Sequence, residues 1–333
     1  MKYKTLGSSG LTISEFVLGA ATFGELTDSR AVDRMVGVAL EQGVTTFDTG
    51  DAYAEGRSEE LLGRALASRR DRVVVCTKVG LRVGDGESDH AVGLRSGYDH
   101  AARWGRGVSP NDQGMSRLHI ASAVDASLRR LGTDHIDLYQ VHRWDPEVPL
   151  EETLGALDDL VRAGKIRYAG CSSYTGWQVI RSLWTSESRR LTRFVSTQVA
   201  YNLLVRDPER ELLPACSDGG VGVLAFQPLA GGMLTGRYDE NAGPEPGSRI
   251  AVRSTYRARY WNPQTFAYVE RLRAIAAASG RTVPELAVGW LLANPRVTAV
   301  LVGAERPEEV EQNLRVVARP LEAAELEAIE NAT

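Results

Sequence analysis

Short runs of apolar and β-branched residues recur along the whole chain, and a helical pattern follows most of them. Between the runs, apolar residues return every three to four positions, for example over residues 29–42, 58–67, 117–131, 150–163 and 208–218. These periodicities predict strands alternating with amphipathic helices. The predicted strands are residues 16–18, 45–47, 73–77, 136–141, 166–170, 195–199, 221–226 and 298–302.

Strands that alternate with helices favour parallel βαβ units. Eight such strands in a chain of 333 residues predict a closed (β/α)8 barrel, the TIM barrel of α/β proteins. A doubly wound open sheet is the competing fold, but it normally carries a glycine-rich turn after its first strand, and none is visible here. Residues 3–6 and 11–13 flank a Gly-Ser-Ser-Gly turn and predict an N-terminal β-hairpin that closes the barrel floor.

Two connections, residues 81–116 and 229–262, are longer than ordinary loops. Loops of more than about 12–15 residues in a compact domain are usually functional. Both follow the carboxyl ends of predicted strands, so we expect both to overhang the barrel mouth, and the first to help form a substrate pocket. Because no linker or low-complexity tract divides the sequence, we expect a single domain over residues 1–333.

Charge and cysteine content narrow the class of protein. The chain has 39 basic and 43 acidic residues, which gives no basic surface for nucleic acid or anionic lipid. The amino-terminal stretch lacks the apolar run of a signal peptide, and no segment approaches the roughly 20 apolar residues that span a bilayer. Three scattered cysteines form neither a disulfide framework nor a metal motif. We expect a cytoplasmic protein without metal, nucleic-acid or membrane partners, and composition does not fix its oligomeric state.

Polar residues stand abruptly at the ends of successive predicted strands. Asp48 ends the second strand and Tyr53 lies in the loop beyond it, Lys78 ends the third strand, and His142 ends the fourth. Each has an ordinary structural explanation when taken alone, as a cap, a packing residue or a loop residue. The carboxyl ends of barrel strands converge on one mouth, however, so we expect the four side chains to meet there.

Together these residues suit proton transfer to a carbonyl oxygen. A free phenol titrates near pH 10, and a neighbouring ammonium such as Lys78 would favour the phenolate and lower the pKa of Tyr53. Asp48 would hold the ammonium, and His142 could donate a hydrogen bond to the substrate oxygen. The set suits the reduction of an aldehyde or ketone, provided that a cofactor delivers hydride.

The segments FDTGDAYAEGRSEELLGRAL, CTK and DLYQVHRWDP resemble the signatures of the aldo-keto reductases. The resemblance extends from YKTLGSSGLTISEFVLGAATFG to VLVGAERPEEVEQNL. The stretch SRLHIASAVDASLRRLGTDHIDLYQVHRWDP is similar to the branch of aryl-alcohol dehydrogenases and bacterial deoxysugar reductases. The resemblance implies a small-molecule carbonyl substrate, NADPH as cofactor, and a catalytic tetrad with Tyr53 as general acid. The tetrad is Asp48, Tyr53, Lys78 and His142.

The resemblance also implies a cofactor site without a Rossmann motif. Ser172 or Ser173, with Gln198, would contact the nicotinamide carboxamide, and Phe226 would stack on the ring. The pyrophosphate would lie against Gln227, Pro228, Leu229 and Gly231, near the charge of Arg237. The adenosine would be held by Gly303, Arg306, Glu309, Gln312 and Asn313.

Two departures from the family pattern concern the cofactor. Glu305 and Glu309 replace a small residue and a Gln, and carboxylates there would repel a 2′-phosphate, whereas Arg306 would attract it. NADPH is the expected cofactor, with NADH as the alternative. Ser173 replaces an Asn, which leaves the partner of the carboxamide open between the two serines.

Two other functions compete with a carbonyl reductase. One is an NADPH-binding redox-sensing regulatory subunit, because channel-associated β subunits share the barrel. The other is a sugar-nucleotide ketone or enone reductase of deoxysugar biosynthesis. Related double-bond reductases can carry Glu at the position of His142, so the histidine argues mildly against reduction of an enone. The presence of both Lys78 and His142 favours an enzyme. Packing and substrate contact are both open for five residues of the long connections: His90, His100, Trp104, Tyr260 and Trp261.

Overall fold

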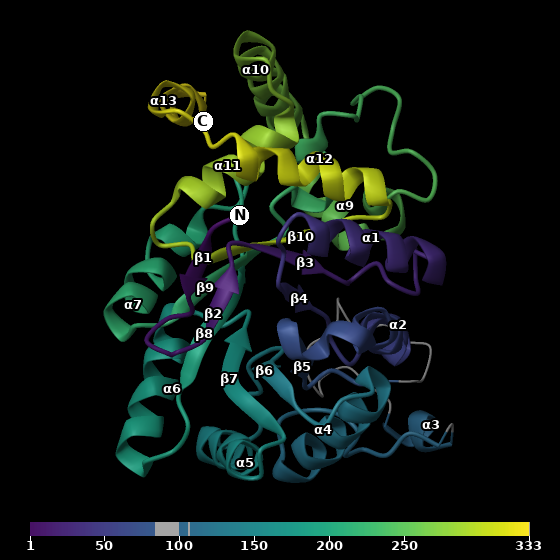
Figure 1. Ribbon diagram of the computed structural model, residues 1–333, viewed down its shortest axis with the longest axis vertical. Helices are drawn as coiled ribbons and strands as arrows, with labels where there is room; N and C mark the ends of the chain where they lie inside the picture. Colours follow the sequence, from purple (N-terminus) through teal and green to yellow (C-terminus); the bar gives the residue numbers. More distant parts are fainter. Residues whose placement is uncertain (84–99, 106, 333) are drawn as a thin grey trace.

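Eight parallel strands form a closed barrel in the computed structural model, which describes residues 1–83, 100–105 and 107–332. The strand order is β10-β3-β4-β5-β6-β7-β8-β9, and each strand falls on one of the eight predicted runs (Figure 1). The predicted TIM barrel is therefore confirmed, and the open sheet is excluded. The strands are β3 (Phe16–Gly19), β4 (Thr46–Asp48), β5 (Val74–Val79), β6 (Ile136–Val141), β7 (Ile166–Ser172), β8 (Phe194–Ala200), β9 (Gly222–Phe226) and β10 (Ala299–Gly303).

The predicted hairpin closes the amino-terminal end of the barrel. Strand β1 (Tyr3–Thr5) pairs antiparallel with β2 (Thr12–Ser14). Leu6 and Ile13 are fully buried and pack into the barrel interior. The N–H of Ser8 donates to the carbonyl of Gly220, just before β9 begins. The hairpin thus fills the floor and leaves the opposite end of the barrel open for a site.

Helices surround the strands and cover their outward faces (Figure 1). Outward residues such as Phe16, Phe47 and Tyr139 are fully buried beneath them in one large core. The long helices are α1 (Ser29–Glu41), α2 (Arg57–Leu66), α4 (Arg117–Leu131), α5 (Leu150–Arg162), α6 (Gly176–Arg189), α7 (Leu212–Gly219), α10 (Pro263–Ser279), α11 (Val283–Ala293), α12 (Pro307–Ala318) and α13 (Ala323–Asn331).

The single helix predicted over residues 208–218 is wrong. A short 3-10 helix spans Asp207–Glu209, and α7 begins only at Leu212. Glu211 separates the two with a non-helical backbone, at φ −135° and ψ −51°. A proline lacks an N–H and disrupts a helix interior, but it is tolerated in the first turn. The break places Pro214 in the first turn of α7 instead of the interior of a longer helix.

Alternation along the strands puts polar side chains at the barrel mouth. Cys76, Leu138 and Leu224 point into the barrel and pack in its apolar interior. Successive side chains on a strand point to opposite faces, so residues two positions later return to the inside. In β5 and β6 those residues are Lys78 and Gln140. The barrel interior is therefore apolar towards the floor and polar towards the carboxyl ends of these strands.

The two long connections contain helical structure. The first includes α3 (His100–Trp104), whereas residues 84–99, with His90 and part of the predicted pocket loop, lie outside the described residues. The second includes α8 (Arg249–Val252) and α9 (Ser254–Tyr260). Within the described part of the chain, no helix combines the length and apolar character needed to cross a membrane.

All three cysteines are buried. Cys76 and Cys171 lie in strands β5 and β7, and Cys216 lies in α7. Burial raises the pKa of the Cys76 and Cys171 thiols, and it raises the pKa of Cys216 to about 12. The thiols are therefore protonated at neutral pH.

Candidate active site

The four predicted catalytic side chains meet at the barrel mouth. The ammonium of Lys78, 1% exposed, donates to Asp48 Oδ1 and, over 2.6 Å, to the carbonyl of Thr49. The same Nζ lies 4.9 Å from the centre of the Tyr53 ring. The rings of Tyr53 and His142 are 5.7 Å apart in an edge-to-face arrangement. The phenol of Tyr53, the ammonium of Lys78 and the imidazole of His142 thus lie close together.

Local structure fixes the turn that carries Tyr53. Strand β4 ends at Asp48, and Tyr53 begins a tight turn, Tyr53–Gly56, whose interior residues are not in the right-handed helical conformation. Side chains anchor the turn, because the hydroxyls of Thr49 and Ser58 lie 2.8 Å apart and Ser58 donates to the carbonyl of Ala20 at 2.7 Å. The turn is thus tied to α2 through Ser58 and to the backbone after β3 at Ala20.

Backbone strain gathers around this mouth. Ala54 and Glu55, directly after Tyr53, have φ of 47° and 56°. Ser173 and Gln227, which follow β7 and β9, both have φ of 58°. Left-handed conformations of residues other than glycine cost free energy and cluster at functional sites. The strain marks the same end of the barrel as the polar side chains do.

A network of two amides orients Asp48. Gln140 and Gln198 donate to Asp48 Oδ2 over 3.0 and 2.8 Å, and Gln198 also donates to Gln140 Oε1 over 3.2 Å. With Lys78, three side chains donate to this carboxylate. The sequence interpretation missed Gln140. It lies beside Lys78 in the sheet register and two residues after inward-facing Leu138, and that spacing could have revealed it.

The electrostatics differ from the expectation for Tyr53. Burial raises the pKa of Tyr53 above its usual value near 10, and it outweighs the lowering by the charge and hydrogen bond of Lys78. Burial alone would lower the pKa of Lys78, but the charges of Asp48 and Tyr53 and the hydrogen bonds to both side chains together outweigh burial and raise it. The predicted lowering of the pKa of Tyr53 is therefore wrong. At neutral pH the site pairs a neutral phenol with an ammonium.

A cavity of about 850 Å³ opens above these residues. Lys78 lies beneath it and is the only predicted site residue that does not line it. At one end the cavity is bordered by Asp48, Tyr53, His142, Ser172, Ser173 and Gln198. The remaining predicted lining residues are Phe226, Gln227, Pro228, Leu229, Gly231, Arg237, Gly303, Arg306, Glu309, Gln312 and Asn313.

At the far end of the cavity, Arg306 and Glu309 form an ion pair. Arg306 precedes α12 and donates to Glu309 Oε1 over 2.9 Å. The other oxygen, Oε2, accepts from the N–H of Glu305 over 2.9 Å. One of the two carboxylates that depart from the family pattern is thus already partnered by a guanidinium and a backbone donor. Glu305 also lines the cavity.

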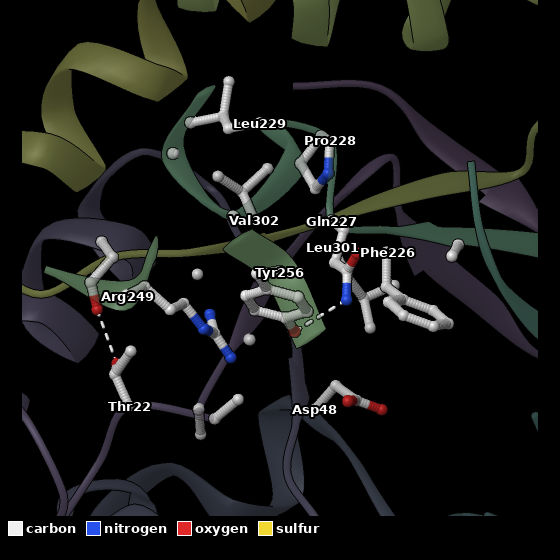
Figure 2. A pocket seen from close by; sticks show the side chains of 18 of the residues that line it. Thr22, Asp48, Phe226, Gln227, Pro228, Leu229, Arg249, Tyr256, Leu301 and Val302 are labelled. Carbon is white, nitrogen blue, oxygen red and sulfur yellow. Dashed lines mark hydrogen bonds between the residues drawn. The ribbon is translucent and has the colours of Figure 1, made fainter. Parts of the chain in front are cut away.

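The second long connection contributes lining residues that the sequence did not predict, notably Arg249 and Tyr256 (Figure 2). Gln227 donates from Nε2 to the hydroxyl of Tyr256 over 2.7 Å, and the hydroxyl of Tyr260 donates to Gln227 Oε1 over 3.0 Å. Arg253 donates to both carboxylate oxygens of Glu25, at 2.6 and 2.7 Å. These bonds hold α8 and α9 over the cavity.

The loop aromatics considered as substrate contacts do not line this cavity among the described residues. Trp104 is 65% exposed on α3, and Tyr260 is buried behind Gln227. Trp261 packs edge-to-face against Tyr238 and Phe266. The side chain of His100 lies outside what the structure describes. Within the described ranges, no three His, Cys, Asp or Glu side chains gather as metal ligands would.

Comparison with known proteins gives a match over nearly the whole chain. Residues 15–333 match the model of the aldo/keto reductase family. An aldo-keto reductase of Fusarium vanettenii is 36% identical over 96% of this chain and 87% of its own. The versiconal hemiacetal acetate reductase of Aspergillus parasiticus is 33% identical over 99% and 96%. A probable voltage-gated potassium channel subunit beta of Arabidopsis thaliana is also 33% identical, over 95% and 91%.

Proposed function

The chain belongs to the aldo/keto reductase family of oxidoreductases, which act on carbonyl compounds with a nicotinamide cofactor, and we propose that it is an NADPH-dependent reductase of aldehydes or ketones. One observation carries the proposal. A buried, protonated phenol lies beside a buried ammonium and an imidazole, at the inner end of a long cavity.

The chemistry of the cavity lining fits a dinucleotide. Gly231 and Gly232, with φ of 68° and 105°, turn the chain tightly beside Arg237, and such turns present backbone N–H groups to anions. We assign the pyrophosphate to Gln227, Pro228, Leu229, Gly231 and Arg237. Arg249, unpredicted, adds a further positive charge to the cavity wall.

We assign the two ends of the dinucleotide to opposite ends of the cavity. Phe226 would pack on the nicotinamide ring, with Ser172 or Ser173 and the amide oxygen of Gln198 at its carboxamide. The amide nitrogen of Gln198 already donates to Asp48. When bound, the reduced nicotinamide supplies the hydride. The adenosine would lie against Gly303, Arg306, Glu309, Gln312 and Asn313.

Tyr53 is the proposed general acid. As the carbonyl carbon is reduced, its oxygen gains negative charge and takes the proton from the Tyr53 hydroxyl. Lys78 stabilises the phenolate that remains, and Asp48 holds the ammonium in place. His142 contributes a hydrogen bond to the same oxygen. A donor aimed at a developing negative charge in a buried site is an effective way to lower a barrier.

We propose NADPH as the preferred cofactor because Arg306, which lines the cavity among the residues assigned to the adenosine, would attract a 2′-phosphate. The charge of Arg237, assigned to the pyrophosphate, acts on Arg306 and adds to the positive potential there. Arg306 also partners Glu309, which reduces the repulsion that this carboxylate would exert on a 2′-phosphate. Glu305 still adds a negative charge, so NADH remains the alternative cofactor.

A regulatory, NADPH-binding subunit is the second candidate function, because of the similarity to a plant potassium channel subunit beta. Both candidates need the cofactor site, whereas only an enzyme needs turnover. The complete set of Asp48, Tyr53, Lys78 and His142 favours the enzyme.

A substrate panel distinguishes these functions. The purified protein is mixed with NADPH and with aryl aldehydes, simple ketoses and nucleotide-linked keto-sugars, and NADPH consumption is followed by absorbance. We expect turnover with at least one class, and the best class identifies the substrate. Tight NADPH binding, measured by calorimetry, without turnover on any member would favour the regulatory subunit.

A further inference from the structure

A second group of buried polar side chains lies beneath the turn that carries Tyr53, and the proposed reaction does not use it. Asp51, Glu59 and Tyr139 are each at most 1% exposed, and Arg130 is the cation among them. Asp51 lies in the turn after β4, Glu59 in α2, Tyr139 in β6 and Arg130 in α4. Two acids and one guanidinium are thus enclosed together.

Each side-chain oxygen of Glu59 has a hydrogen-bond donor. Its Oε1 accepts from the Thr77 hydroxyl and its Oε2 from Arg130 Nε, each over 2.6 Å. The guanidinium of Arg130 is directly engaged with Glu59.

Asp51, in contrast to Glu59, has few hydrogen-bond donors around its carboxyl group. Its Oδ1 accepts only from the neighbouring N–H of Ala52, over 2.7 Å, and its Oδ2 has no hydrogen-bond partner among the described residues. Burying an ionised carboxylate without donors is costly, and the charge of Glu59 disfavours a second negative charge nearby. Burial, followed by the charge of Glu59, raises the pKa of Asp51 well above its usual range, and Arg130 and Lys78 lower it less.

We propose that Asp51 remains protonated in the folded protein at neutral pH and acts, as an uncharged carboxylic acid, as the positioning residue of the turn that carries Tyr53. The N–H of Asp51 donates to the carbonyl of Lys78 over 3.4 Å. The backbone of Asp51 therefore ties the turn to β5 at Lys78, and its side chain fixes the following residue, Ala52, directly before Tyr53.

The charge state of Asp51 affects the electrostatic potential at Tyr53. Lys78 is the cation that stabilises the phenolate, and its charge is felt at Asp51. An ionised Asp51 would partly cancel the positive potential that Lys78 exerts at Tyr53. The phenolate of Tyr53 would then be less stable. The role in catalysis rests on the proposed function, whereas the protonation of Asp51 does not.

The raised pKa of Asp51 determines how the stability of the fold depends on pH. The charged or titratable groups that act on Asp51 from packed elements of the described chain are Glu59 of α2, Lys78 of β5, Arg130 of α4 and Tyr139 of β6. An acid whose pKa is raised by folding stabilises the fold fully below its unfolded pKa of about 4, and this contribution is lost as pH rises through the folded pKa. Asp51→Asn, which cannot ionise, removes this dependence.

The protonation state is tested on the full chain with Asp51→Asn and with the control Asp33→Asn, which removes an exposed carboxylate on α1. Difference infrared spectra at neutral pH should show a protonated-carboxyl carbonyl band in the wild type that Asp51→Asn lacks and Asp33→Asn keeps. Between pH 5 and pH 8, the wild type should lose thermal stability relative to Asp51→Asn. Identical infrared spectra, or a wild type that gains stability relative to Asp51→Asn as pH rises, would overturn the proposal.

The positioning role is tested by comparing Asp51→Ala with Asp51→Asn on the best carbonyl substrate. Misplacing a catalytic group by about 1 Å costs on the order of 100-fold, so a loosened turn in Asp51→Ala should lower kcat by at least about 10-fold with an unchanged Kd for NADPH. The isosteric, uncharged Asp51→Asn should recover most of that loss. An Asp51→Asn protein as slow as Asp51→Ala would show that the carboxylate is required and would overturn the proposal.

The outcomes separate the two proposals. Absence of turnover in the wild type on every carbonyl would remove the proposed function, and the infrared and unfolding results would still decide the protonation of Asp51. If Asp51→Ala does not fold, kcat of Asp51→Asn against that of the wild type decides the role. A loss of more than about 10-fold in Asp51→Asn would contradict it.

Discussion

At the scale of single residues, opposing electrostatic effects decide what Tyr53 can do. Burial favours the neutral phenol, whereas the ammonium of Lys78 favours the phenolate, and burial prevails. The phenol of Tyr53 is therefore protonated at neutral pH, and the ammonium of Lys78 lies beside it, where it would stabilise the phenolate left by the proposed proton donation. Asp48 serves by keeping Lys78 charged and fixed.

Replacing Tyr53 with Phe tests this assignment, because it removes the hydroxyl and leaves the ring. We expect kcat for carbonyl reduction to fall by about 10²–10⁴-fold, the range for general acid–base groups, with little change in the Kd for NADPH. Tyr268→Phe is the matched control, since Tyr268 is a buried phenol of α10 that does not line the cavity. A Tyr53→Phe enzyme that keeps a third of wild-type turnover would remove Tyr53 from the mechanism.

Arg306 gives a second test at this scale. If its guanidinium binds the 2′-phosphate, Arg306→Ala should weaken NADPH binding by about 1–3 kcal/mol and leave NADH binding nearly unchanged. The loss also leaves Glu309 without its cationic partner. Calorimetric titration with both cofactors measures the difference, with Arg64→Ala, an exposed arginine of α2, as the control. Equal losses for NADPH and NADH would make Arg306 structural.

At the scale of elements, close helix packing holds the site from outside. Helix α2 follows the turn that carries Tyr53 and lies against α4 at Gly63. A Cβ at Gly63 would lie 2.2 Å from the carbonyl oxygen of Leu131, the last residue of α4. The absence of a side chain at this one position therefore lets the two helices approach.

Gly63→Ala should accordingly destabilise the protein, because a carbonyl oxygen of a helix end cannot move aside easily. We expect a loss of about 1–3 kcal/mol in the free energy of unfolding, as for overpacked cores. Gly37→Ala is the control on α1, where an added Cβ meets nothing within 4 Å, and it should gain about 0.5–1 kcal/mol from helix propensity. Denaturant unfolding of both variants measures the contrast, and shifts of the same sign would refute the packing argument.

Periodicity predicted most elements but not all of them. The barrel strands are regular because each buries both faces, and Asp48, Lys78 and His142 were recognisable as polar breaks in apolar runs. Arg249 and Tyr256 were not, because α8 and α9 are short and their place over the cavity depends on contacts with residues far away in sequence, such as Glu25. The neutral state of Tyr53 also depends on burial, which no local pattern encodes.

At the scale of the whole molecule, we propose that the chain folds as one domain. The buried residues of the outer core form one cluster whose members extend along the chain from Phe16 to Ala332, and the barrel interior includes Leu6 of the amino-terminal hairpin. Asp158 connects α5 to Thr192, in the segment between α6 and β8. It accepts from the N–H and hydroxyl of Thr192, each over 2.9 Å, and from Arg162 Nε over 2.6 Å.

Asp158→Asn should therefore lower the whole unfolding transition, not split it. Burial would raise the pKa of Asp158, but the hydrogen bonds from Arg162 and Thr192 outweigh it and lower the pKa. An acid with a lowered pKa stabilises the fold above its unfolded pKa, and this contribution is lost as pH falls through the folded pKa. We expect a deficit of about 1–3 kcal/mol at pH 7 that shrinks below about pH 4, followed by calorimetry. A second transition in the mutant would contradict the single domain.

The buried cysteines have a practical consequence for the protein in air. Oxidants and alkylating reagents attack the thiolate of an accessible cysteine. Cys76, Cys171 and Cys216 are each at most 1% exposed and hold their protons at neutral pH. Peroxide therefore finds no cysteine to modify in the native fold, and the protein should keep its activity without added reductant. A loss of activity on exposure to peroxide would therefore come from a group other than a cysteine thiol.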